Sequence, residues 1–342
     1  MLKVKDEGVI LRRTNLPFES EGVFNPGCIE VDGVVHMFYR AVRPGNHSTI
    51  GYCQLRDNDV IKRNDEPVLV PEYDYEKQGV EDPRIVFLDG VYYLFYTAYD
   101  GRNALVAYAT SDDLTHFTKR GIVSPAIPYG EFIDIIAPNK RVSRRYSHYG
   151  HRVAHCNGAD VLVWDKDAFI FPRKFDNSFW LVHRIMPGIQ IAAFRDFAEL
   201  TPAYWREYFR TFDRHTLFEP RFHFEKQKIG GGCPPVETDA GWLFIYHGVG
   251  RLFLRPKYYA AAALLDRDNP RKVIARLPYP LFAPSSRWER KGIVDNVVFP
   301  TSALLKDGRV YIYHGGADTC IGLKSVALAD LIGDLKRHPV NS

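Results

Sequence analysis

One pattern of predicted strands recurs five times along the 342-residue chain. Each copy starts with a short apolar or proline-containing segment that leads into a strand. An Asp-Gly-like turn, an aromatic strand and a strand of small residues follow. Asp-Gly turns between alternating runs are typical of β-hairpins. Repeated antiparallel units limit their exposed edges by closing radially. The sequence therefore predicts an all-β protein, a five-bladed β-propeller.

The prolines at the strand starts set the register of the copies. They are Pro26, Pro83, Pro172, Pro235 and Pro300. Their spacing exceeds the about 40–50 residues of compact blades, so we expect long loops. A hydrophobic content of 46% is enough for one large core, and residues 1–342 are interpreted as a single domain. Residues 131–157 are basic and are interpreted as an inserted loop, over the site or at a subunit contact; residues 197–210 could form short helical turns.

In a propeller the first strand of each blade lines a central channel, so the strand starts converge there. This places Asn25, Asp82, Lys174, Glu237 and the Phe299-Pro300 segment around one axis. The ends of the second strands add a further set, which is Arg40, Thr97, His183, Arg184, His247 and His314. Residues far apart in sequence are therefore expected to share one site.

The segment Glu81-Asp82-Pro83-Arg84 is the only copy of the repeat with paired acids. A structural interpretation makes Asp82 the cap of a turn, with Arg84 as its ion-pair partner. The functional interpretation makes Asp82 a general acid at the rim of a pocket. In that case Glu81 supports the site and does not react.

The third copy of the repeat carries the basic residues. His183 and Arg184 end an otherwise apolar strand, which alone would indicate only a strand end that reaches water. Together with Lys174 they form a candidate oxyanion or phosphate site. A hydrolase of neutral sugars has little need for such a cluster.

Two related segments, Tyr246-His247-Gly248 and Tyr313-His314-Gly315, are either strand-ending turns or parts of the site. Asp318 follows a glycine-rich turn and is suited to binding paired sugar hydroxyls. Asn25 and Arg40 could bind sugar in the same way.

Composition narrows the classes of protein. A net charge of +4 does not indicate a nucleic-acid partner, and it is compatible with an anionic small substrate. The five cysteines are far apart and the N-terminus has no signal-peptide pattern, so we expect a cytoplasmic protein without a membrane segment. A zinc site from the histidines of residues 148–156 is a weaker interpretation because its spacing fits no standard pattern. We expect no metal and no cofactor.

The motif Gly79-Val80-Glu81-Asp82-Pro83-Arg84-Ile85 resembles the signature of glycoside hydrolase family 130, the β-mannoside phosphorylases and related β-mannosidases. The resemblance continues over nearly the whole chain, through segments around Asn25, Arg40, residues 165–174, His183-Arg184, Tyr246-His247 and Asp318. It implies a five-bladed propeller. The sequence departs from the family pattern at the basic insertion and at Arg173, where Glu is usual, and both departures bear on acceptor specificity.

The resemblance also implies roles for individual residues. Asp82 is the catalytic acid, which in this family is thought to act through a sugar hydroxyl. Phosphate is held by Lys174, His183 and Arg184, with Tyr246 or His247 as further candidates. The expected substrate-binding set is Asn25, Arg40, Glu81, Arg84, Glu237 and Asp318.

The expected function is inverting phosphorolysis of β-mannosides, with inorganic phosphate as co-substrate and α-mannose 1-phosphate as product. Phosphate is itself the nucleophile, so this reaction needs the acid but no catalytic base, whereas an inverting hydrolase needs both. The alternatives are a β-mannosidase on the same fold and a non-catalytic carbohydrate-binding propeller. A homo-oligomer is compatible with the resemblance.

Overall fold

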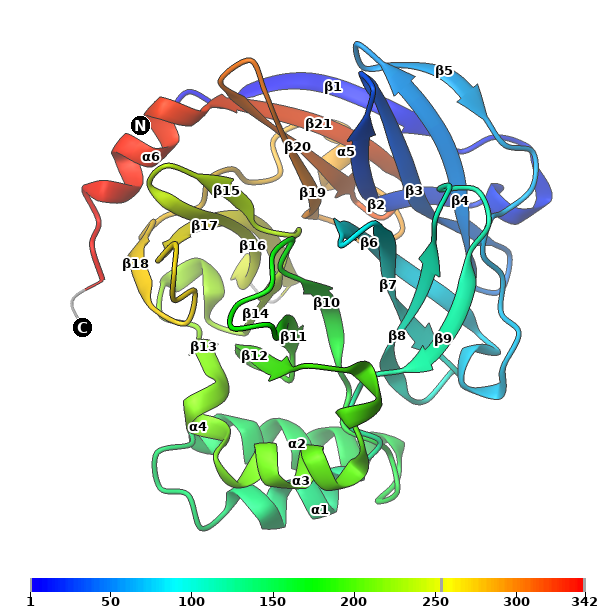
Figure 1. The fold of residues 1–342 in the computed structure, drawn as a ribbon. Coiled ribbons are helices and arrows are strands. Elements are labelled where there is room, and N and C mark those ends of the chain that lie inside the picture. The colour runs from blue at the N-terminus through cyan, green and yellow to red at the C-terminus, as the bar shows by residue number, and fades with distance from the viewer. Residues whose placement is uncertain (1, 253–254, 341–342) are drawn as a thin grey trace.

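The computed structural model describes residues 2–252 and 255–340, and β-strand is the main secondary structure of these residues (Figure 1). The all-β prediction is confirmed. The first large sheet contains β2 (Gly22–Val31), β3 (Val34–Arg43), β4 (His47–Arg56), β5 (Asp59–Arg63), β6 (Gly79–Leu88), β7 (Val91–Tyr99), β8 (Ala104–Ser111) and β9 (Thr118–Ile122). Its two antiparallel halves, β2–β5 and β6–β9, are joined by one parallel pair, Ser48 with Gly79.

Three further sheets follow. The second contains β10 (Lys166–Ile170), β11 (Phe179–Arg184), β12 (Ile189–Phe194) and β13 (Thr216–Phe218). The third contains β14 (Lys228–Gly231), β15 (Val236–Thr238), β16 (Gly241–Leu252), β17 (Arg255–Leu265) and β18 (Val273–Arg276). The last contains β19 (Val298–Lys306), β20 (Arg309–Gly316), β21 (Cys320–Ala327) and the N-terminal strand β1 (Lys5–Arg12), which pairs antiparallel with β21.

The turns between first and second strands follow the prediction. Asp32, Asp89 and Asp307 each have a φ near +50°, and each is followed by a glycine with positive φ. Two successive residues of this conformation form the tight hairpin turn whose twist matches that of the strands. These turns fix which side chains of each hairpin face the core.

The first strands lie side by side at the centre of the molecule. Strand β2 contacts β6 and β19, β6 contacts β10, and β10 contacts β14. In the part of the chain that the structure describes, five apolar clusters lie between successive groups of strands. Residues near the starts of the first strands are thereby brought to one place, as the repeat predicted.

The basic segment of residues 131–157 is helical, so its interpretation as a loop is wrong. Helices α1 (Tyr129–Ile136) and α2 (Arg144–Asn157) pack together, and α1 also packs on α3 (Pro202–Arg210) (Figure 1). Tyr146, Gly150 and Val153 recur at helical spacing and are buried, whereas the basic residues occupy the other face of α2. The high charge of the segment concealed this narrow apolar stripe.

The remaining helices are short. They are α4 (Phe212–His215), α5 (Arg287–Arg290), α6 (Leu328–Lys336) and the 3-10 turns η1 (Pro17–Glu19), η2 (Asp74–Glu76), η3 (Phe197–Glu199) and η4 (His223–Glu225). The turns expected within residues 197–210 are therefore present as η3 and α3. No helix in residues 2–252 and 255–340 has the length and apolarity to cross a membrane.

Candidate active site

A cavity of about 210 Å³ lies where the first strands meet. Polar side chains from all four sheets line it. They are Asn25, Arg40, Asp82, Lys166, Asp167, Arg184, Lys228, Tyr258 and Asp318, and the apolar part of the lining is Val294, Val297 and Phe299. We refer to this cavity as the central pocket.

Three of the lining residues share one backbone feature, a positive φ at a shift in strand register. Asn25, Asp82 and Asp167 have φ values of 51°, 52° and 57°, although each lies within a strand. At each of them the pairing with the second strand shifts register, as in a β-bulge. Such bulges re-aim side chains and store local strain, and they are common at functional sites. Here the bulge occurs in β2, β6 and β10 and brings a polar side chain to the central pocket each time.

Asp82 is held from three sides. The Asn25 side-chain amide donates a hydrogen bond to Asp82 Oδ1 at 2.8 Å, and Arg40 Nη1 lies 3.5 Å from the same oxygen. The buried Arg84 donates from Nη1 to the Asp82 backbone carbonyl at 2.9 Å. Arg84 therefore supports the backbone of Asp82 and does not line the pocket.

Glu81 joins the two sides of the pocket. It accepts hydrogen bonds from Arg40 Nη2 at 2.8 Å and from Lys166 Nζ at 3.3 Å. Burial alone would raise the pKa of Glu81, but the charges of Arg40 and Lys166 outweigh it and lower this pKa. Glu81 is therefore an anionic bridge that positions two cations.

Asp318 has a different electrostatic environment. Burial raises its pKa to about 7, and the nearby Asp82 and Glu81 carboxylates act in the same direction, against Arg40. Near neutral pH this carboxyl group can therefore donate a hydrogen bond as well as accept one.

The other side of the pocket is cationic. Lys166, Arg184 and Lys228 all line it. Burial, together with the neighbouring Arg184 charge, lowers the pKa of Lys228 to about 7. An anion bound here would favour the charged form of Lys228 and would gain charge-assisted hydrogen bonds.

Buried polar atoms without a hydrogen-bond partner occur on both sides of the central pocket. Over the described residues they include Asn25 Oδ1 beside Asp82, and Asp167 Oδ2, Arg184 Nε and both ring nitrogens of His247 near the cations. Arg184 Nε lies 3.2 Å from Asp167 Oδ2 as an ion pair, but without hydrogen-bond geometry. Native proteins leave few such groups unsatisfied, so a cluster of them indicates a polar ligand site.

Of the residues predicted from sequence, six line the pocket. They are Asn25, Arg40, Asp82, Arg184, Phe299 and Asp318. His183 is fully buried and contacts Asp165 at 3.1 Å and Tyr208 at 2.9 Å; Asp165 also accepts from the Arg184 backbone amide. His247 lies 3.8 Å from Asp167, and burial lowers its pKa to about 3, so it is neutral. Neither histidine lines the central pocket, but His183 directly precedes Arg184 and His247 contacts Asp167, and both of these residues line it.

Three predicted residues are not brought to the central pocket. Lys174 forms an ion pair with Asp89 at 2.8 Å, at the hairpin end of the sheets. Glu237 pairs with Arg173 and Arg267, and more than a third of its side chain is exposed. Tyr246 is buried and donates to Glu225, while Arg276 donates to its hydroxyl oxygen.

Sequence reasoning missed Lys166, Asp167, Lys228 and Tyr258. A signal for two of them existed, because Asp165-Lys166-Asp167 opens an apolar strand as Val80-Glu81-Asp82 does. The prolines predict that the first strand of the third copy begins near Pro172, whereas the structure places Asp167 at the position equivalent to Asp82. They likewise predict that the first strand of the fourth copy begins near Pro235, whereas β14 starts at Lys228.

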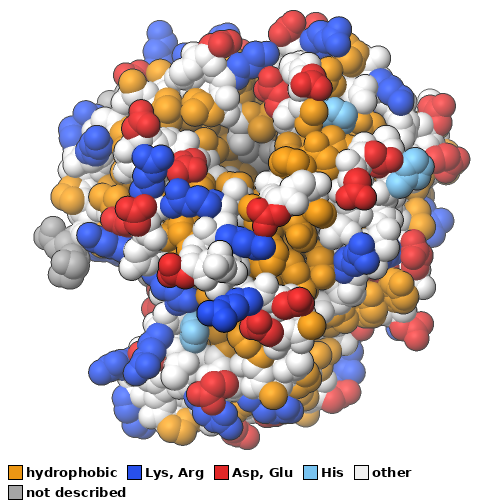
Figure 2. Space-filling view, viewed as in Figure 1, with side chains coloured by type: hydrophobic (Ala, Val, Ile, Leu, Met, Phe, Trp, Pro, Cys, Tyr) orange, Lys and Arg blue, Asp and Glu red, His pale blue; other side chains and the backbone are white. Residues whose placement is uncertain are grey.

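Two observations concern possible metal ligands and the cysteines in the described residues. No group of three His, Cys, Asp or Glu side chains in that part of the chain could hold a metal ion. All five cysteines are free, and only Cys156 among them is exposed. Figure 2 shows charges of both signs mixed over the face in view, in keeping with the small net charge.

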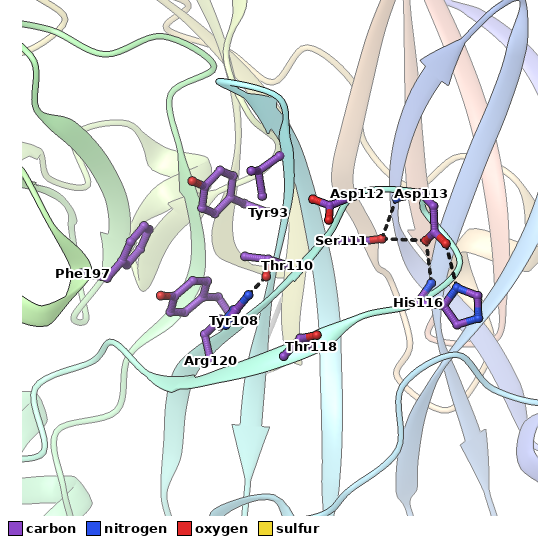
Figure 3. Close-up of a pocket in the computed structure, with 11 residues that line it drawn as sticks. Tyr93, Tyr108, Thr110, Ser111, Asp112, Asp113, His116, Thr118, Arg120 and Phe197 are labelled. Atoms are coloured by element: carbon purple, nitrogen blue, oxygen red, sulfur yellow. Dashed lines mark hydrogen bonds and ion pairs between the residues drawn. The ribbon is translucent and has the colours of Figure 1, made fainter.

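A second hollow of about 480 Å³ lies over β7, β8 and β9 (Figure 3). Its aromatic side chains stack on one another, with Tyr108 and Phe197 ring centroids 4.3 Å apart. Asp113 is already bound by Ser111 and His116. None of the predicted site residues lines this hollow.

Comparison with known proteins finds mannoside phosphorylases whose names carry different linkages. A family model described as beta-1,4-mannooligosaccharide phosphorylase matches residues 7–337. The chain is 31% identical to a 1,2-beta-oligomannan phosphorylase of Thermoanaerobacter sp. (strain X514), over 97% of this chain and 99% of that protein. It is 33% identical to a beta-1,2-mannobiose phosphorylase of the same strain, over 90% of each. The solved structure of a beta-1,2-mannobiose phosphorylase from Listeria innocua, in complex with beta-1,2-mannobiose, has a similar fold, with a TM-score of 0.73 at 20% identity, over 98% of this chain and 100% of that one.

Proposed function

Since this chain belongs to glycoside hydrolase family 130, we propose that it catalyses the inverting phosphorolysis of β-mannosides. Inorganic phosphate is the co-substrate, and the products are α-mannose 1-phosphate and a shortened sugar. The observation that carries this function is the division of the central pocket. Asp82 lies with Asn25 and Arg40, whereas Lys166, Arg184 and Lys228 lie with Asp167.

In the proposed reaction phosphate binds on the cationic side and attacks the anomeric carbon. Asp82 supplies the proton to the leaving oxygen, directly or through a substrate hydroxyl. Asn25, Arg40 and Asp318 bind the mannosyl unit, and Glu81 and Arg84 hold the acid and the cations in place. His183 positions Arg184 through Asp165, and His247 positions Asp167. Lys174, Glu237 and Tyr246 take no part in binding at this pocket.

The proposed architecture is a five-bladed propeller around the central pocket. The large sheet counts as two blades, because only one residue pair joins its halves. The pairing of β1 with β21 would close the ring by completing the last blade with the N-terminal strand. Five apolar clusters between successive groups of strands support the same count over the described residues.

Three further expectations accompany this proposal. A cytoplasmic location stays a prediction. Activity is expected without an added metal or cofactor. A homo-oligomer stays a prediction.

Phosphate dependence is the test of the proposed reaction. With β-mannobiose as substrate, we expect mannose 1-phosphate to form only when inorganic phosphate is present. Release of free mannose at the same rate without phosphate would identify a hydrolase. Binding of mannobiose without turnover under either condition would identify a carbohydrate-binding protein.

The pKa of Asp318 predicts the pH dependence of mannoside binding. The group is neutral below pH 7 and ionises above it, so a hydrogen bond that it donates to a sugar hydroxyl is lost as the pH rises through about 7. At saturating phosphate we expect kcat/KM for the mannoside to fall by up to about tenfold per pH unit above this point.

The matched variant is Asp318→Asn, since its amide can donate at every pH and asparagine tolerates the φ of 55° found at this position. The variant should lack the alkaline decline between pH 7 and 8.5. An unchanged decline in the variant would exclude Asp318 as the titrating group.

A further inference from the structure

A larger hollow, of about 730 Å³, lies between helix α2 and the segment that joins η4 to β14. Five cationic side chains line it, and no carboxylate does. They are Arg144, Arg145, Arg152, Lys226 and Arg251. We refer to this hollow as the basic pocket.

The charges of the basic pocket are not neutralised within the described part of the chain. None of its five cations forms an ion pair there. By contrast, Arg141, between α1 and α2, pairs with Asp213, and Arg206, in α3, pairs with Glu131. Arg145 donates instead to the backbone carbonyls of Lys226 at 2.9 Å and Gln227 at 3.2 Å. Its guanidinium group is therefore fixed in place with its charge unpaired.

Burial raises the pKa of the Glu219 carboxyl group and outweighs the charge of Arg145, which acts to lower this pKa. Like-charged groups repel one another, so gathering five of them costs folding free energy unless an anion binds among them. The composition of the pocket thus indicates an anionic ligand.

The basic pocket adjoins the cationic side of the central pocket. Gln227 lines the first and the next residue, Lys228, lines the second. Val249 pairs with Lys228 on one side and with Tyr258 of the central pocket on the other, and Arg251 is two residues further along β16. The charge of Arg152 contributes to lowering the pKa of Lys228. The two pockets therefore lie close together at the start of β14.

We propose that the basic pocket is an auxiliary site for small phosphate-bearing ligands, inorganic phosphate on its way in and hexose 1-phosphate on its way out. The identity of these ligands rests on the proposed function. Arginine forks match phosphate oxygens in geometry as well as in charge. A volume of about 730 Å³ is within the roughly 300–1,000 Å³ of small-molecule sites and far exceeds the need of one phosphate ion. A cationic pocket next to the central pocket also raises the local concentration of an anionic substrate.

The test uses a triple variant, Arg144→Gln, Arg152→Gln and Arg251→Gln, which leaves the structural hydrogen bonds of Arg145 intact. Its control, Arg43→Gln, Arg56→Gln and Lys62→Gln, removes the same charge from exposed positions of β3–β5. At low ionic strength we expect the triple variant to raise the KM for phosphate about 5- to 10-fold, with kcat unchanged. The difference should vanish at about 0.5 M salt, and the control should behave as the unmodified protein.

Calorimetric titration examines binding separately, with inorganic phosphate and α-mannose 1-phosphate in separate runs. We expect each to occupy two sites per chain in the unmodified protein and one in the triple variant. An unchanged stoichiometry together with an unchanged KM for phosphate overturns the proposal. If the protein shows no phosphate-dependent turnover but the triple variant still loses one binding site, the proposed function fails and the basic pocket stands.

Discussion

Replacing Asp82 by asparagine should lower the rate of phosphorolysis by about 10²–10⁴-fold, the range expected for loss of a general acid. The substitution removes the transferable proton and preserves nearly everything else. Asn25 can still donate to Oδ1, and asparagine is among the residues that tolerate the positive φ of 52° at this position. Mannose 1-phosphate release at saturating phosphate measures the effect. Alanine would be a poorer test, because it would add backbone strain to the loss of the acid.

Asp89→Asn is the matched control for this substitution. Asp89 has the same φ of 52° and follows the same strand, but it lies at the exposed hairpin turn and pairs with Lys174. We expect its turnover to remain within about twofold of the unmodified rate, as for ordinary surface substitutions. Near-normal turnover in Asp82→Asn, with a normal thermal transition, would contradict the role of Asp82 as the acid.

The repeat predicted the all-β fold and the convergence of distant residues because it depends on local chemistry. Asp-Gly turns and aromatic strands are determined by short-range backbone and packing preferences, and these appear in the sequence. The acid side of the site follows directly, since Asn25 and Asp82 each precede a proline in a bulged strand. The side chains of Arg40 and Asp318 reach the same pocket from the second strands and the turn beyond them.

The cationic side was predicted less completely for a physical reason. In the third copy the bulge at Asp167 is followed by alanine, so the proline that marks the other copies is missing there. A register set by Pro172 is shifted by several residues, so it predicts Lys174 at the site instead of Lys166. Strand β14 likewise has no proline at its start. Its Gly230 leaves room for Asp167 and His247, because a Cβ there would clash with both side chains. Close approach between strands leaves no periodic signal in a single sequence.

Replacing Arg184 by glutamine should raise the KM for phosphate by roughly 10- to 100-fold, as expected when a hydrogen bond to a charged group worth about 1.5–3 kcal/mol is lost. Affinity for the mannoside should change far less, because Asn25, Arg40 and Asp318 are untouched. The substitution leaves Asp167 without its cation, and an unpaired buried carboxylate is destabilising. The double variant Arg184→Gln with Asp167→Asn removes both charges and separates lost phosphate binding from lost stability.

Lys174→Gln distinguishes the site seen in the structure from the one that the sequence alone suggested. If phosphate binds on the cationic side of the central pocket, this variant should keep its KM for phosphate within about twofold, because Lys174 pairs with Asp89 at the hairpin end. If Lys174→Gln weakens phosphate binding as strongly as Arg184→Gln does, phosphate must bind elsewhere. Initial rates measured across phosphate concentrations, at one saturating mannobiose concentration, compare the two variants directly. Both substitutions remove one positive charge, one from the connection between β10 and β11 and one from the end of β11. A difference in the KM for phosphate therefore reports where each residue lies relative to the bound phosphate.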